Sequence, residues 1–287
     1  MNEFNGMYES IINKAVERTK EAHPMNVNDV FGTDGLLRCA VCGEPKEEFF
    51  EIPGFGTRKG GCDCRCDRER KAAEEMKKKK EANEKRRQAA FGSVNSKRFS
   101  FTFENDDGQN RAVSEQLKLY CDNFKKYRKD GSGLMIYSSS NGGGKTFLAC
   151  AIANRLIDEG YTVRVSDMLE LRDELFKGDK RAFLLELRRN DLVIIDDIGT
   201  ESANANTLEA EYRIINDLTE NYIPLVVTTN YTPKELAESN DRDKRRIFDR
   251  ILGVCVPVRV DPPNGRSRRI VNCQRLLEDF KSVNAAE

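Results

Sequence analysis

From about residue 111 onward, short apolar runs alternate with longer amphipathic segments. Most of these runs are apolar on both faces of an extended chain, which is typical of strands in a parallel sheet with helices on both sides. The pattern therefore predicts an α/β domain with a parallel sheet between helices. The expected strands are 134–137, 162–165, 191–195, 224–228 and 255–260, and the expected helices are 111–127, 145–159, 167–177, 180–189, 206–221, 233–238 and 243–252.

The first ninety residues follow another pattern. Apolar positions at helical spacing in residues 7–22 predict a short amphipathic helix, and a Cys- and Gly-rich segment follows at 38–66. Residues 67–90 contain 10 basic and 6 acidic residues and almost no apolar face. Such a composition is typical of a solvated helix or a flexible connector. We therefore expect three parts: a helix with a cysteine module at 1–66, a charged helical linker at 67–96, and the α/β domain at 97–287.

The charge balance excludes a globally basic nucleic-acid-binding protein. Lys+Arg and Asp+Glu both total 48 in 287 residues, so any nucleic acid has to bind to a local basic patch. No apolar stretch approaches the ~20 residues that span a bilayer, and the first residues lack the layout of a signal peptide. We therefore expect a cytoplasmic protein without a membrane partner, in a compartment where disulfides seldom persist.

Five of the nine cysteines lie between positions 39 and 66, as C-x2-C, 19 further residues, and C-x-C-x-C. Paired cysteines at this separation are typical of a structural zinc site, and the only histidine lies well outside the segment, so four thiolate ligands are expected. The candidates are Cys39 and Cys42 with two of Cys62, Cys64 and Cys66, and the spacing leaves open which two. Disulfides or free thiols in an irregular loop are the alternatives. The other four cysteines are expected to be buried: Cys121, Cys150, Cys255 and Cys273.

The segment 138-SSSNGGGKTFLAC-150 joins an expected strand to an expected helix. A strand, a Gly-rich loop and a helix arrange backbone N–H groups around phosphate oxygens. Ser139 stands where the pattern G-x-x-x-x-G-K-[ST] has its first glycine, so we expect Gly142 and Gly143 to supply the backbone freedom and nucleotide binding to be somewhat weakened. Lys145 is expected to reach the β- and γ-phosphates, and Thr146 to offer its hydroxyl to Mg²⁺. The expected loop residues are Ser139, Ser140, Asn141, Gly142, Gly143, Gly144, Lys145 and Thr146.

Two further strands end in polar residues. In 191-DLVIIDDIGTE-201 an apolar run leads into Asp196 and Asp197, and 223-IPLVVTTN-230 ends at Thr229 and Asn230. Phosphoryl transfer needs a carboxylate in the Mg²⁺ shell, expected of Asp196, and a group that orients water, expected of Asp197. Asn230 or Thr229 is expected at the carboxyl edge of the sheet, where such folds bind ligands. The alternative for both strand ends is ordinary turn and capping chemistry.

Arginines form two groups near the end of the chain. Arg242, Arg246 and Arg250 recur every four residues, so they share one helix face, and 265-GRSRR-269 follows. An arginine that stabilises γ-phosphate charge acts within its own chain or in a neighbouring subunit, and the spacing does not say which. A solvated basic face is the alternative interpretation.

These motifs together resemble the DnaC/DnaI-type helicase loaders, a branch of the AAA+ ATPases that also includes the IstB-like transposition ATPases. The resemblance spans residues 97–272 and rests on GLMIYSSSNGGGKTFLACAIAN, DLVIIDDIGTE, PLVVTTNYTPKEL, RRIFDRI and GRSRR. It implies an AAA+ P-loop core that hydrolyses ATP with Mg²⁺. The residue roles that it implies are Walker A for Lys145 and Thr146, Walker B for Asp196 and Asp197, sensor 1 for Asn230, an arginine finger reaching the next subunit for Arg250, and sensor 2 for Arg269.

The same resemblance implies partners. It describes a loader that places a hexameric replicative DNA helicase on single-stranded DNA, that associates with itself through the ATPase domain, and that contacts the helicase through the zinc module. The helix pair at 167–189 is implied to grip single-stranded DNA, although a solvated face is the alternative. Its basic residues are Lys177, Lys180, Arg181, Arg188 and Arg189. Two other functions stay open: an IstB-like transposition helper, and a zinc-containing adaptor with a degenerate ATP site, which Ser139 alone supports.

Overall fold

The computed structural model describes residues 2–92, 96–108, 110–139, 142–199, 205–239 and 241–260. The chain divides into two compact units, Met1–Glu81 and Ala82–Glu287, called here the N-terminal and the C-terminal unit. In the part of the chain that is described, no helix has the length and apolarity to cross a membrane.

The N-terminal unit combines one helix with two small antiparallel sheets. Thr19 of the helix accepts a hydrogen bond from the backbone N–H of Gly61 at 3.1 Å, and a Cβ on Gly61 would lie 2.4 Å from the Thr19 carbonyl oxygen. Glycine is therefore required where the helix packs on the second sheet. The elements are α1 (Asn2–Ala22), β1 (Val30–Phe31) paired with β2 (Leu37–Arg38), and β3 (Glu47–Ile52) paired with β4 (Gly56–Gly61).

A buried ion pair holds the loops of this unit. The Lys46 ammonium lies 2.8 Å from an Asp29 carboxylate oxygen, with side chains only 3% and 1% exposed. Lys46 also donates to the carbonyl of Pro24 at 2.7 Å, and Asp29 accepts from the backbone N–H groups of Asn26 and Ala40. The hydrogen bond from Lys46 lowers the pKa of Asp29. Both charges are thus satisfied inside the unit, and each depends on the other.

Helix α2 (Arg65–Phe91) carries the charged segment. Every residue from Arg68 to Glu81 is exposed, as the high charge and the missing apolar face predict, whereas Asn83, Ala90 and Phe91 near its end are buried. In the C-terminal unit Arg87 pairs with Asp158 at 2.6 Å. The end of α2 therefore belongs to the core of the C-terminal unit.

A five-stranded parallel sheet forms the centre of the C-terminal unit, in the order β6-β7-β8-β5-β9. Every residue of β7 and β8 is buried, which explains why their sequences are almost wholly apolar. The predicted α/β class with a parallel sheet is confirmed. The strands are β5 (Gly133–Tyr137), β6 (Val163–Asp167), β7 (Leu192–Asp196), β8 (Leu225–Thr229) and β9 (Cys255–Arg259).

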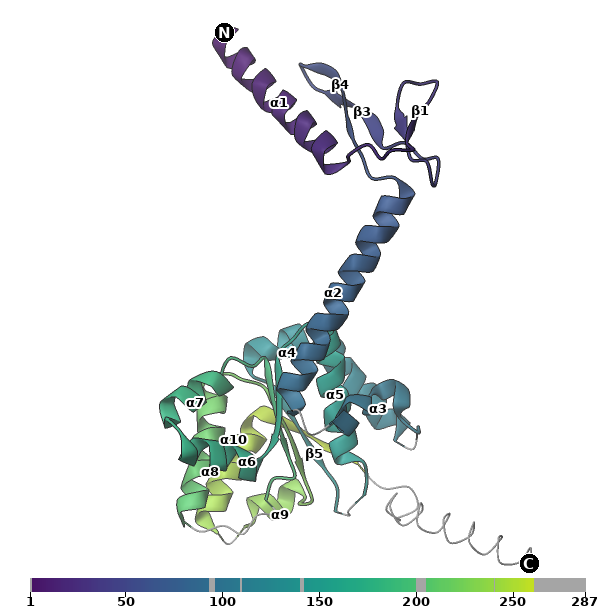
Figure 1. Cartoon of the computed structure of the whole chain (residues 1–287). Helices are drawn as coiled ribbons and strands as arrows, with labels where there is room; N and C mark the ends of the chain where they lie inside the picture. Colours follow the sequence, from purple (N-terminus) through teal and green to yellow (C-terminus); the bar gives the residue numbers. More distant parts are fainter. Residues whose placement is uncertain are drawn as a thin grey trace, which may run out of the picture. The chain divides into compact units, whose positions relative to one another are not determined.

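Helices cover both faces of this sheet, α3, α4 and α5 on one side and α6, α7, α8 and α10 on the other (Figure 1). The expected helices are confirmed with one correction, because 111–127 forms two helices that meet at Asn123. There the Asn123 side chain donates to the Leu119 carbonyl at 2.9 Å and the backbone leaves the helical conformation. The helices are η1 (Ser96–Ser100), η2 (Phe103–Asn105), α3 (Arg111–Asp122), α4 (Phe124–Asp130), α5 (Lys145–Glu159), α6 (Met168–Lys177), α7 (Lys180–Leu187), α8 (Ala205–Glu220), α9 (Pro233–Ala237) and α10 (Arg242–Val254).

Lys46→Met should destabilise the N-terminal unit by about 3 kcal/mol or more, because it leaves the buried Asp29 carboxylate without its cation. Hydrogen exchange of the backbone amides in residues 37–61 measures the loss. Lys77→Met, on the exposed part of α2, is the matched control and should change nothing. Equal protection in both variants would contradict a stabilising role for the pair.

Candidate functional site

Two glycines of the loop before α5 have a left-handed backbone. Gly142 and Gly144 have φ values of 86° and 89°, in the left-handed region that glycine enters without cost. A Cβ on Gly143 would lie 3.2 Å from the Ser138 hydroxyl, so the loop backbone runs close to the end of β5. Gly142 thus has the backbone freedom expected of it, whereas the second left-handed residue is Gly144 and not the expected Gly143. Ser140 and Asn141 lie outside the described residues.

Lys145, the first residue of α5, is buried, and its Nζ donates a hydrogen bond to Asn230 Oδ1 at 2.7 Å. Burial is the largest influence on the pKa of Lys145 and lowers it, while Asp197 and Asp196 act in the opposite direction. A desolvated ammonium gains strongly from an anion placed beside it. The lysine is therefore suited to a phosphate group, which is the role expected of it.

Asp196, at the end of β7, joins three elements through its two carboxylate oxygens. Oδ1 accepts hydrogen bonds from the hydroxyls of Thr146 at 2.9 Å and Thr228 at 2.7 Å. Oδ2 lies 3.5 Å from the guanidinium of Arg98. A hydroxyl and a carboxylate in contact at the helix start are hard oxygen donors of the kind that Mg²⁺ takes, so Thr146 and Asp196 fit this ion.

Asp197 leaves the strand conformation, with φ of 59°. In a continuing strand its side chain would point away from that of Asp196, because successive residues face opposite sides. The left-handed conformation instead puts its carboxylate 3.1 Å from the amide nitrogen of Asn230. Asn230 therefore contacts both Lys145 and Asp197. The residues that follow β5, β7 and β8 thus lie together at one edge of the sheet.

Two residues of this cluster carry no sequence signal of their own. Thr228 holds both aspartates, since its hydroxyl also accepts the backbone N–H of Asp197 at 2.8 Å. Successive residues of a strand point to opposite faces of the sheet, so Thr228 and Thr229 lie on opposite faces of β8. Which of these faces carries Asp196 is known only from the register of the strands. Arg98 lies in η1, where nothing in the spacing indicates that its side chain reaches Asp196.

Arg250 lies on α10, away from the hydrogen bonds described above. Its guanidinium pairs with Glu220 of α8, and its side chain is 40% exposed. The Glu220 hydrogen bond is the main cause that raises the pKa of Arg250, followed by the one to Tyr212. Arg246, one turn earlier, stacks over the Tyr212 ring at 4.5 Å. Arg269, with the 265–269 group, lies outside the described residues.

The basic residues of the α6–α7 pair are mostly exposed. Lys177 pairs with Asp173 at 3.1 Å, and Arg188 is held by two hydrogen bonds to Asp217 of α8. The other three face solvent: Lys180, Arg181 and Arg189.

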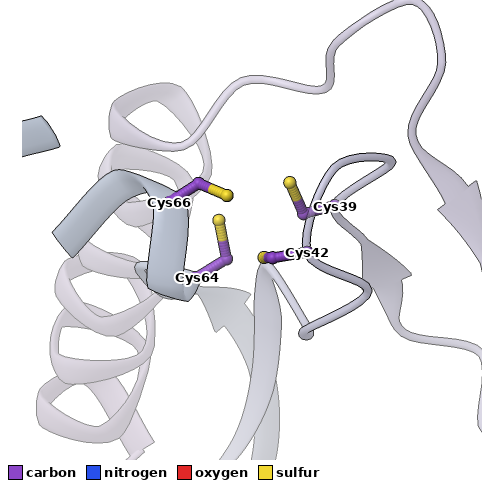
Figure 2. Close-up of side chains that lie close together, drawn as sticks. All are labelled: Cys39, Cys42, Cys64 and Cys66. Atoms are coloured by element: carbon purple, nitrogen blue, oxygen red, sulfur yellow. The ribbon is translucent and has the colours of Figure 1, made fainter. Parts of the chain in front are cut away.

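Four cysteine sulfurs of the N-terminal unit lie within 4.8 Å of one another (Figure 2). They belong to Cys39, Cys42, Cys64 and Cys66, so the structure resolves the choice that spacing leaves open. Cys62 is outside the group, and its sulfur contacts the Pro45 carbonyl at 3.6 Å. Tetrahedral zinc with Zn–S bonds of about 2.3 Å would need sulfurs roughly 3.8 Å apart, so the four residues fit a zinc ion.

The surroundings of the cluster shift the pKa values of its thiols in opposite directions. N–H groups of Cys66 and Glu44 donate to the Cys42 sulfur and lower the pKa of this thiol to about 6. Burial raises the pKa of Cys64 to about 12, so a cation is needed to hold that sulfur as thiolate. The remaining described cysteines, Cys121, Cys150 and Cys255, are buried in the C-terminal unit as expected, and Cys273 lies outside the described residues.

Comparison with known proteins gives consistent results. Residues 69–273 match the family of IstB-like ATP binding proteins. The chain is 27% identical over 180 residues to the replicative helicase loader DnaI of Bacillus subtilis strain 168, a match that covers 58% of each chain. It is 29% identical over 129 residues to the uncharacterised protein YdaV of Escherichia coli strain K12, covering 42% of this chain and 47% of that protein. The chain thus spans about half the length of these relatives.

A solved structure shares the fold. The crystal structure of the DnaC helicase loader superposes with a TM-score of 0.50 at 22% identity, covering 58% of this chain and 99% of that one. At this identity the likeness shows the fold alone. The parallel α/β core expected from the motifs is confirmed, and it is the fold of this helicase loader structure.

The cysteine geometry predicts which substitutions remove zinc. Cys64→Ser should lower the zinc content of the purified full chain to near zero, because it removes one of the four clustered sulfurs. Cys62→Ser, two residues away, should retain about one equivalent. Elemental analysis measures both, and equal zinc in the two variants would refute this ligand set.

Proposed function

The chain belongs to the family of IstB-like ATP-binding proteins, and we propose that it is an ATP-dependent helicase loader. In this proposal it delivers a replicative DNA helicase onto single-stranded DNA at the start of replication. The relationship to DnaI, a replicative helicase loader, supports this role. The observation that carries the proposal is the meeting of Lys145, Thr146 and Asp196 at the carboxyl edge of the sheet.

Each residue of the cluster takes one task in this proposal. Lys145 neutralises the β- and γ-phosphates, and Thr146 and Asp196 hold Mg²⁺, which supplies charge stabilisation of the transferred phosphoryl group. Asp197 orients the attacking water. Asn230, which contacts both Lys145 and Asp197, keeps the phosphate-binding and water-orienting groups in a fixed relation.

We propose that Arg250 acts on the ATP of a neighbouring subunit. Its side chain is partly exposed, and its pairing with Glu220 directs it to the surface made by α8 and α10. Self-association through the C-terminal unit would bring this surface to the next subunit's phosphates, where an arginine stabilises developing charge.

Two exposed surfaces have the chemistry needed to bind a helicase and single-stranded DNA. In the N-terminal unit the large apolar side chains Met7, Tyr8 and Ile11 of α1 are each more than half exposed, which suits a protein partner such as the hexameric helicase. The exposed basic residues of the α6–α7 pair suit the phosphates of single-stranded DNA. A loader acts where the helicase is, in the reducing cytoplasm, where thiolate ligands to zinc persist.

The phosphate role of Lys145 and the intersubunit role of Arg250 predict different defects. Lys145→Ala should abolish binding of a fluorescent ATP analogue, because it removes the buried cation. Arg250→Ala should bind the analogue normally but hydrolyse ATP at least about 100-fold more slowly. Arg246→Ala, on the same helix face, is the control and should keep most turnover. Unchanged hydrolysis in Arg250→Ala would remove the intersubunit role.

The loader proposal predicts a stable complex of the full chain with a hexameric replicative helicase. Replacing Met7, Tyr8 and Ile11 by serine should weaken the complex at least about tenfold in a pull-down without changing ATP binding, because these apolar side chains are truncated at an interface. A chain that instead co-purifies with a transposase would be a transposition helper. Absence of phosphate release with or without single-stranded DNA would favour the adaptor.

A further inference from the structure

Arg98, which belongs to none of the sequence motifs described above, forms an ion pair with Asp196. Its Nη2 lies 3.5 Å from Asp196 Oδ2, and the two side chains are 26% and 10% exposed. Among the described residues, Asp196 is the only carboxylate within ion-pair distance of Arg98. Because the other oxygen, Oδ1, already accepts two hydroxyl hydrogen bonds, Oδ2 is the oxygen with capacity for a further partner.

The backbone of the Arg98 segment is fixed from the other side by Asn154 of α5. The Asn154 amide is almost fully buried and donates to the carbonyls of Arg98 at 3.0 Å and Phe101 at 2.9 Å. Its own oxygen accepts from Arg87 Nε of α2 at 3.1 Å. A continuous series of polar contacts therefore runs from α2 through Asn154 and Arg98 to Asp196.

Aromatic packing supports the same connection. The ring of Phe91, at the end of α2, lies 5.6 Å from that of Phe99, which follows Arg98. Phe91 is buried in the core of the C-terminal unit. Displacement of Arg98 would therefore act on both the hydrogen bonds and the packing that hold the last turns of α2.

We propose that Arg98 is a positioning residue of the ATP site, which competes with Mg²⁺ for Asp196 Oδ2 and transmits the result to α2. The inference rests on the proposed ATP site and adds a regulatory residue to it. A guanidinium beside a nearly buried carboxylate reduces the negative charge that a divalent cation meets there. When Mg²⁺ and nucleotide bind, Arg98 yields the oxygen, and the 98–101 segment shifts the contacts that Asn154 makes with Arg87.

A magnesium titration of nucleotide binding tests the competition. The full chain and the variants Arg98→Gln and Arg98→Lys are titrated with Mg²⁺ at a fixed concentration of a fluorescent ATP analogue. Arg98→Gln keeps a polar but shorter side chain and removes the charge, so the Mg²⁺ midpoint should fall roughly threefold or more. Arg98→Lys keeps the charge and should stay near the parent value. A midpoint that is unchanged or higher in Arg98→Gln overturns the proposal.

Hydrogen exchange tests the transmission. Mg²⁺ and nucleotide should change the exchange of residues 82–91 in the parent chain, and this change should be at least halved in Arg98→Gln. A merely structural role would alter exchange equally with and without ligand, which would overturn the transmission. If the parent chain binds no analogue at any Mg²⁺ concentration, the proposed ATP site itself is wrong. If the parent chain binds normally and Arg98→Gln has the same Mg²⁺ midpoint, only the proposed role of Arg98 is wrong.

Discussion

The carboxylate of Asp196 is the group on which the arrangement of the C-terminal unit depends. Its Oδ1 accepts hydroxyl hydrogen bonds from Thr146 at the start of α5 and from Thr228 in β8, while Asp196 itself ends β7. These bonds form only if β7 and β8 are paired in this parallel register and the first turn of α5 lies next to their carboxyl ends. Since all strands of a parallel sheet end at the same edge, the fold collects these groups without long connections.

The same site concentrates unfavourable features. Lys145 is a buried ammonium whose pKa is lowered by desolvation, and Asp197 has a left-handed backbone that costs a non-glycine residue about 1 kcal/mol or more. Neither is needed to build an α/β sheet. An anionic ligand would offset the desolvation of the lysine, while the left-handed conformation of Asp197 lets its carboxylate accept the hydrogen bond from Asn230.

The N-terminal unit solves a different stability problem. Among its described residues only Leu37, Cys39 and Cys64 are buried apolar side chains, so its core is far too small to stabilise it alone. The buried Lys46–Asp29 pair stabilises the unit from within, and a zinc ion bound by the four clustered cysteines would replace the rest of the missing core. The apolar residues that do not enter a core are left exposed on α1 and the short strands, which is the surface a protein partner can use.

The parallel α/β class and the order of the elements could be predicted from the amino-acid sequence, because apolar runs and the glycines between them are local features of the chain. The spacing of the cysteines also predicted that those between positions 39 and 66 form a metal site. Tertiary structure alone decided that Cys64 and Cys66, not Cys62, complete the cluster, since the direction of each sulfur depends on where α2 begins. The contacts of Thr228 and Arg98 with Asp196 are likewise known only from the tertiary structure. Contacts between residues far apart in the chain depend on strand register and packing, and the spacing of residues in the sequence does not reveal them.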